Sequence, residues 1–152
     1  MGDLQIETKK SLLTMNTMAL PSTAEYFCSA STVDEVKKAL SFAREHNLAV
    51  TPLGAGSNVV FASNLSGLVL HLGLKGWESV APQGVSTKYI DVTFTAGENW
   101  HDMVLMCLDR GWYGLENLSL IPGNMGAAAI QNIGAYGVEL SSRLVSLQVV
   151  DI

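Results

Sequence analysis

Residues 114–140 read GLENLSLIPGNMGAAAIQNIGAYGVEL, with five glycines, four alanines and very little charge. Small side chains at this density let the backbone approach a neighbour closely, and glycine permits turns with positive φ that other residues resist. Residues such as Ile121, Ile130 and Tyr136 are too apolar for a solvent-exposed loop. The neighbour of this segment is therefore expected to be a ligand.

A second small-residue loop, GAGSN at residues 54–58, directly follows an apolar run. It does not complete the dinucleotide fingerprint G-x-G-x-x-G, because Val59 stands where the third glycine belongs, and the chain has no P-loop motif. A tight turn between two strands would explain the two glycines equally well. The hydroxyl of Ser57 and the amide of Asn58, beside several backbone N–H groups, instead favour a nest for a phosphate-bearing cofactor.

The later segment offers a second anion-binding feature. Asn124 is expected to cap a short helix over residues 125–131. The N-terminus of that helix would present unpaired N–H donors and the positive end of its dipole to an anion. Two such loops in one short chain suggest a ligand that carries phosphate and is held mainly by backbone amides.

Composition and charge exclude several classes of protein. The chain has 152 residues, 48% hydrophobic and 15% charged, as expected for one globular domain or two small ones. A net charge of −5 with scattered basic residues argues against nucleic-acid binding. Cys28 and Cys107 match no metal spacing and are expected to be buried free thiols. No signal peptide or membrane-spanning run is present in the sequence, so a soluble cytoplasmic protein is expected.

Two longer helices are predicted from caps and periodicity. Thr32 and Glu35 form a capping box that begins a helix ending near His46. Asn99 caps a second amphipathic helix, which Gly111 ends. The last predicted strand runs to the end of the sequence, which suggests a truncated piece of a longer protein. The predicted strands are residues 48–53, 59–62, 68–72, 77–81, 89–96 and 144–152.

The titratable residues indicate no catalytic site. His46, His71 and His101 are expected to be structural or solvated. Glu116 and Glu139 flank the glycine-rich segment, but the sequence gives neither of them a partner for acid–base catalysis. Composition and spacing alone therefore predict a domain that binds a phosphate-bearing ligand, and they indicate no more specific function.

The motifs themselves resemble the UDP-N-acetylenolpyruvoylglucosamine reductase (MurB) family, in the form of its type I branch. The resemblance rests on GAGSN at residues 54–58, on GENWH at residues 97–101, on Asn16-Thr17 and on the whole of residues 114–140. It covers nearly all of the chain from about residue 12. It implies an α+β fold of the FAD-binding PCMH/vanillyl-alcohol-oxidase type, with two small α/β subdomains, truncated at the C-terminus.

The resemblance also implies a division of the chain and a set of contacts. Residues 1–19 would be a lead-in, residues 20–73 the first FAD-binding subdomain and residues 74–152 an incomplete second one, with the substrate-binding domain absent. Tyr136 would lie where the substrate enters. The residues implied to bind FAD are Gly54, Ala55, Gly56, Ser57, Asn58, Val59, Ile121, Pro122, Gly123, Gly126, Ala127, Ile130 and Gly134.

The activity implied is that of a bacterial, cytoplasmic and monomeric enzyme of peptidoglycan synthesis. Such an enzyme uses FAD and NADPH to reduce UDP-N-acetylglucosamine enolpyruvate to UDP-N-acetylmuramate. The family's catalytic residues are expected downstream of Ile152, so the chain contains none of them and is expected to be inactive alone. Two alternatives stay open: a non-catalytic flavin- or nucleotide-binding module, and another FAD oxidase of the same fold. Those oxidases often tether FAD through a histidine or cysteine, which neither loop contains.

Overall fold

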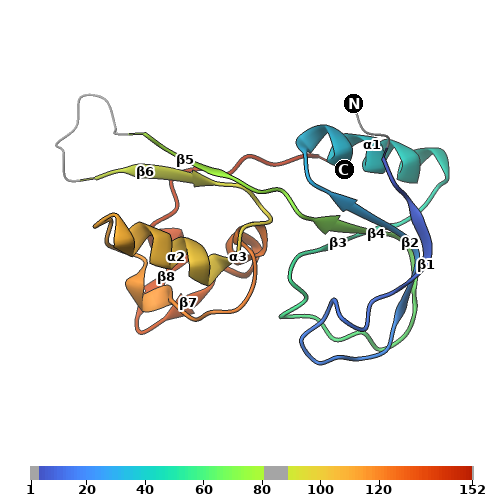
Figure 1. Cartoon of the computed structure of the whole chain (residues 1–152), viewed down its shortest axis with the longest axis horizontal. Coiled ribbons are helices and arrows are strands. Elements are labelled where there is room, and N and C mark those ends of the chain that lie inside the picture. Colours follow the sequence, from blue (N-terminus) through green and yellow to red (C-terminus); the bar gives the residue numbers. More distant parts are fainter. Residues whose placement is uncertain (1–3, 81–88, 152) are drawn as a thin grey trace. The chain divides into compact units, whose positions relative to one another are not determined.

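The computed structural model describes residues 4–80 and 89–151 and divides the chain into two compact units (Figure 1). Unit 1 is Met1–Leu74 with Val150–Ile152, and unit 2 is Lys75–Val149. The assignment of two FAD-binding subdomains to residues 20–73 and 74–152 stays a prediction. Unit 1 contains β1 (Glu7–Ser11), β2 (Thr23–Ala30), α1 (Val33–Glu45), β3 (Val50–Leu53) and β4 (Leu65–Leu72). Unit 2 contains β5 (Trp77–Val80), β6 (Asp91–Phe94), α2 (Trp100–Asp109), η1 (Glu116–Leu118), α3 (Met125–Gln131), β7 (Gly134–Ala135), β8 (Val138–Glu139) and η2 (Leu140–Ser142).

The sheet of unit 1 has the strand order β1-β2-β4-β3. Strands β2, β4 and β3 are parallel, and β1 pairs with β2 in the antiparallel sense. A register shift between Ala24 and Tyr26 lets Ala24 and Phe27 pack on the same face of β2, although they are three residues apart. Residues 1–19 were predicted to be a lead-in to the first subdomain. Strand β1 lies within this segment and pairs with β2, so the segment contributes a strand to the sheet.

Each face of this sheet has its own apolar cluster. Helix α1 covers one face, where Leu40 packs with Cys28 and Leu68. The other face carries Phe27 and Val69, which pack with Leu12, Leu53 and Phe61 from the loops and strand ends beside them. Burial on both faces explains why β4 is apolar along most of its length, as is usual for a central parallel strand.

The capping box of α1 is confirmed with one difference. The Thr32 side chain accepts a hydrogen bond from the Glu35 backbone N–H (3.2 Å), as predicted. The Glu35 carboxylate accepts hydrogen bonds from the backbone N–H (2.7 Å) and hydroxyl (2.8 Å) of Ser31, one residue before the cap. These bonds hold the pKa of Glu35 below its ordinary value, the Ser31 N–H contributing most.

Unit 2 is built around α2, whose predicted start and end are confirmed. The Asn99 side chain accepts a hydrogen bond from the Asp102 N–H (3.1 Å), and Gly111 follows the helix with φ of 71°. Trp100, which is 2% exposed, donates its indole N–H to the Leu118 carbonyl (2.6 Å). The rest of the core is made by Val104, Leu118, Ala128, Ile133 and Leu140.

Two predicted strands are absent from the described residues. Residues 59–62 form no strand, because they belong to the connection that returns from the end of β3 to the start of the parallel strand β4. Residues 144–151 are exposed and pair with no strand among the described residues, so apolar alternation alone did not make them a strand. The strands predicted at residues 89–96 and 77–81 are present as the shorter β6 and β5, and Ala81 lies outside the described residues.

Both cysteines are free and buried, as predicted, and burial raises the pKa of each thiol. Over the described residues, no cluster of three or more histidine, cysteine, aspartate or glutamate side chains could hold a metal ion. None of the helices in the described ranges is both long and apolar enough to cross a bilayer.

Candidate functional site

The GAGSN loop begins directly at the carboxyl end of β3. Leu53, the last residue of that strand, is 3% exposed and anchors the start of the loop in the sheet. Gly56 is buried and has φ of 67°. A Cβ atom on Gly56 would collide with the backbone carbonyl of Met15, so only glycine fits there.

The loop offers backbone donors to a ligand. Among the described residues, the backbone N–H groups of Ala55, Gly56 and Asn58 have no protein acceptor. Buried N–H groups normally find a partner, which makes the Gly56 N–H a candidate for binding an anion. Ala55 and Asn58 are exposed, so a ligand can reach them. The loop therefore suits a phosphate group held by backbone amides, as the sequence suggested.

The N-terminus of α3 does not match its prediction. The helix is present and Asn124 is its N-cap, but the Asn124 side chain makes no capping hydrogen bond. The N–H of Met125 donates to the Glu98 carbonyl (2.9 Å), and that of Gly126 donates to the Ala96 carbonyl (3.0 Å). The next two N–H groups both donate to the Asn124 carbonyl (3.1 Å each). The expectation of unpaired donors for an anion is therefore wrong, because backbone carbonyls of the same chain accept hydrogen bonds from these N–H groups.

The remaining residues of the second loop fall into four settings. Pro122, Gly123 and Ala127 line a cavity of about 10 Å³ beside Trp100, which holds at most one water molecule. Gly126 is required by packing, because a Cβ there would lie 2.8 Å from that of Ala96. Ile121 is half-buried against the core of unit 2. Ile130 lies on the outer face of α3 and is 88% exposed.

Tyr136 stands at the tip of a tight hairpin that sequence reasoning did not find. Strands β7 and β8 pair Gly134 with Glu139 and Ala135 with Val138. Tyr136 and Gly137 are the two residues between them, with φ of 51° and 77°. Positive φ at both positions marks a type I′ turn, in which asparagine and glycine are the favoured residues. Tyrosine at such a position is strained, and this one is 89% exposed.

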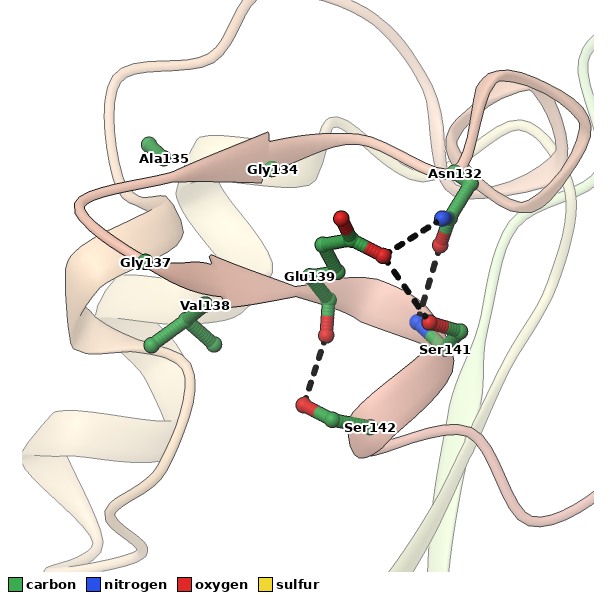
Figure 2. Close-up of a pocket in the computed structure, with 8 residues that line it drawn as sticks. All are labelled: Asn132, Gly134, Ala135, Gly137, Val138, Glu139, Ser141 and Ser142. Carbon is green, nitrogen blue, oxygen red and sulfur yellow. Dashed lines mark hydrogen bonds between the residues drawn. The ribbon is translucent and has the colours of Figure 1, made fainter.

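A polar pocket lies beside this hairpin (Figure 2). The Glu139 carboxylate accepts a hydrogen bond from the Asn132 amide (3.0 Å), whose oxygen accepts one from the Ser141 N–H (3.0 Å). Asn132 ends α3 in the left-handed conformation, with φ of 42°. Of the residues predicted to contact FAD, only Gly134 lines this pocket. Its polar side chains are hydrogen-bonded to one another, and we interpret these bonds as a structural link between the hairpin and the end of α3.

The histidines and glutamates have structural partners. The His46 ring nitrogen Nδ1 lies 2.8 Å from the Phe42 carbonyl, and His101 Nδ1 accepts a hydrogen bond from the Leu120 N–H (3.2 Å). His71 Nδ1 lies 2.9 Å from the hydroxyl of Ser29 on the neighbouring strand. Hydrogen bonds from backbone N–H groups, its own first and then that of Gly114, lower the pKa of Glu116.

A comparison with known families decides what this fold is. Residues 24–151 match the profile of a family described as the FAD binding domain. The chain belongs to this FAD-binding domain family. The α+β fold and the FAD cofactor that the sequence resemblance implied are thereby confirmed.

Named relatives of this FAD-binding domain agree with the resemblance. The chain is 39% identical over 149 residues to a UDP-N-acetylenolpyruvoylglucosamine reductase of Amoebophilus asiaticus, covering 98% of the chain and 43% of that protein. It is 40% identical over 148 residues to the reductase of Pseudomonas savastanoi pv. phaseolicola, covering 97% of the chain and again 43% of the relative. The chain thus spans less than half the length of these proteins.

A solved structure shares the fold of the domain. The crystal structure of UDP-N-acetylenolpyruvylglucosamine reductase (MurB) from Thermus caldophilus superposes with a TM-score of 0.65. The match covers 91% of this chain and 46% of that one, at 22% sequence identity. At this identity the match establishes the fold of the domain.

Proposed function

We propose that this FAD-binding domain is part of a UDP-N-acetylenolpyruvoylglucosamine reductase that uses NADPH. The reaction would reduce the enolpyruvyl group of the UDP-sugar to give UDP-N-acetylmuramate for peptidoglycan. The single observation that carries the proposal is the identity of about 40% to two reductases of that name, over nearly the whole chain. The protein would act in the bacterial cytoplasm as a monomer, with no membrane or nucleic acid as partner.

The residues of unit 1 would hold the diphosphate of FAD. The support comes from three backbone N–H groups of the GAGSN loop for which no described protein group is an acceptor. They belong to Ala55, Gly56 and Asn58. Backbone amides can bind two phosphate charges without a lysine. Each charge-assisted hydrogen bond of this kind contributes about 1.5–3 kcal/mol.

The residues of unit 2 would cover the flavin part. Their contribution is apolar, since the N–H groups at the start of α3 are already paired. Ile130 is 88% exposed and Tyr136 is 89% exposed, so both side chains are accessible to such a ligand. FAD, when bound, supplies the hydride chemistry that protein side chains lack. The role left for these side chains is to orient that group and to exclude water from it.

No residue of this chain is assigned to the chemical step. Reduction of an enol ether next to a carboxylate builds negative charge, which positive groups and a proton donor must stabilise. We place those groups in the part of the protein beyond Ile152. Removing even one such contact typically raises the activation free energy by about 2.7–4 kcal/mol, so the chain by itself should be inactive.

The experiment that tests this function compares the chain with the longer protein that contains it. NADPH oxidation is measured with and without UDP-N-acetylglucosamine enolpyruvate, after loading each protein with FAD. We expect turnover that depends on the UDP-sugar in the longer protein and none in the chain alone. If the longer protein binds FAD but never oxidises NADPH faster with the UDP-sugar, the chain is a flavin-binding module or belongs to another oxidase.

A further inference from the structure

A turn formed by residues 12–20, which we call the Asn16 turn, packs behind the GAGSN loop. Asn16 is 6% exposed, and its side chain closes the turn with three hydrogen bonds. The amide nitrogen donates to the carbonyls of Leu12 (2.9 Å) and Leu20 (3.1 Å), and the amide oxygen accepts from the Leu20 N–H (2.9 Å). A buried polar group with all these bonds made strongly favours one conformation of the turn.

The Asn16 turn is fixed to the sheet on one side and to the loop on the other. Leu12 is fully buried in the apolar cluster of the sheet, and its N–H donates to the Ser22 carbonyl (2.8 Å). On the other side, the Thr17 N–H donates to the Gly56 carbonyl (3.1 Å). The Met15 backbone fills the space beside the α-carbon of Gly56. The position of the loop is therefore set by the turn as well as by β3.

We propose that Asn16 is a positioning residue for phosphate binding by the GAGSN loop. By holding the turn against Gly56, Asn16 would fix the position of the loop and with it the N–H groups of Ala55, Gly56 and Asn58. Hydrogen bonds weaken steeply with misalignment, so a small displacement of the loop weakens several of them at once. The inference rests on the proposed function, because it takes the loop to be the phosphate site.

A positioning role differs from a structural one in what it changes. If Asn16 only stabilised unit 1, its loss would lower the free energy of unfolding and leave the affinity of the folded protein unchanged. Asn64 provides the matched control in the same unit. Its side chain also fastens backbone, accepting a hydrogen bond from the Thr23 N–H (3.0 Å), but it makes no described contact with the GAGSN loop.

The test compares Asn16→Ala and Asn64→Ala with the unaltered chain, using ADP as the probe because it carries a diphosphate without the flavin. Backbone NMR signals of Ala55 and Asn58 report binding, and the same spectra give the folded fraction that corrects each Kd. We expect Asn16→Ala to weaken ADP binding about tenfold or more, which corresponds to the loss of one hydrogen bond to a charged group. We expect the Kd of Asn64→Ala to match that of the unaltered chain.

The outcomes separate this inference from the proposed function. An unchanged Kd in Asn16→Ala, or an equal loss in both variants, would overturn the positioning role and leave the phosphate site in place. If ADP moves no signal of residues 54–58 in the unaltered chain, the loop is not a phosphate site. The proposed diphosphate-binding role of unit 1 and the positioning role of Asn16 would then both be wrong.

A second measurement needs no variant and serves if Asn16→Ala does not fold. Hydrogen exchange of the backbone amides is followed in the unaltered chain with and without ADP. If the Asn16 turn holds the loop in position, bound ADP should slow hydrogen exchange of the Thr17 and Leu20 amides as well as of the amides in the loop itself. Protection confined to residues 54–58, with unchanged exchange at Thr17, would overturn the inference.

Discussion

The carbonyl oxygen of Met15 stands where a side chain on Gly56 would have to go. This relationship changes the meaning of the second glycine in the GAGSN motif. From the sequence, the glycine was expected to admit a ligand close to the backbone. In the structure it admits another part of the same chain, and it also has φ of 67°. The fold of unit 1 therefore requires Gly56 whether or not a ligand is bound.

The first prediction is that Gly56→Ala destabilises unit 1 far more than positive φ alone would. Gly111 is the matched control, because its φ of 71° is nearly the same and no atom lies within 4 Å of a Cβ there. Gly111→Ala should cost about 1–2 kcal/mol, the usual penalty of left-handed backbone. Gly56→Ala should cost about 1–3 kcal/mol more, since the Met15 backbone must move. Urea unfolding, followed by NMR signals of each unit, gives the two values, and equal costs would contradict the packing argument.

The second prediction concerns the indole hydrogen bond in the core of unit 2. Trp100→Phe keeps an aromatic ring but leaves the Leu118 carbonyl without the indole N–H that donates to it. An unsatisfied buried polar group costs about 1–3 kcal/mol, so unit 2 should lose that much stability. Trp77→Phe, at a residue 37% exposed, should cost less. All three tryptophans lie in unit 2, so the fluorescence of the two that remain follows urea unfolding of that unit. Equal stability of the two variants would show that the bond contributes little.

Local signals in the sequence were enough to predict the helices of both units. The caps at Thr32 and Asn99 and the stop at Gly111 depend on residues within one turn of each other, and all three are present. Strands need a partner, and partners are distant in the sequence. Val59 and Val60 look like strand residues, but the chain there crosses from the end of β3 to the start of β4, so Val60 is left 69% exposed.

The candidate site was predicted less completely, for the same physical reason. The small residues of both loops were read as room for a ligand, yet Gly56 and Gly126 make room for Met15 and Ala96. The first two donors at the start of α3 are taken by the carbonyls of Glu98 and Ala96, about thirty residues earlier in the chain, and the next two by the Asn124 carbonyl. Asn16 could be noticed as part of a family motif, but its hydrogen bonds appear only once the turn is folded.

The third prediction is a pH dependence at the start of α1. The pKa of Glu35 is lowered in the fold, chiefly by the Ser31 N–H and then by the Ser31 hydroxyl. A lowered pKa contributes stability that is present above the unfolded value of about 4.3 and is lost as pH falls through the folded value. Ser31→Ala should raise the pKa of Glu35 toward the ordinary value and shrink this acid-dependent loss. Carboxyl carbon NMR titration measures the pKa, and the exposed Ser66→Ala is the control that should leave it unchanged.

The fourth prediction is that Tyr136→Asn stabilises unit 2. Tyr136 has φ of 51° at the first position of a type I′ turn before Gly137, and asparagine-glycine is the favoured pair there. Relief of the left-handed penalty should add about 0.5–1 kcal/mol to the free energy of unfolding.

Tyr113→Asn is the matched control for that substitution, because Tyr113 is 78% exposed and its φ is not positive. It should leave the stability of unit 2 nearly unchanged in urea unfolding followed by tryptophan fluorescence. A strained, exposed tyrosine persists only where something other than stability favours it, and strain of this kind clusters at functional sites. Under the proposed function, Tyr136→Asn in the longer protein should therefore be more stable and bind FAD or the UDP-sugar more weakly. A variant that is stabilised and retains full affinity for both would remove Tyr136 from the site, and one that is destabilised would refute the strain itself.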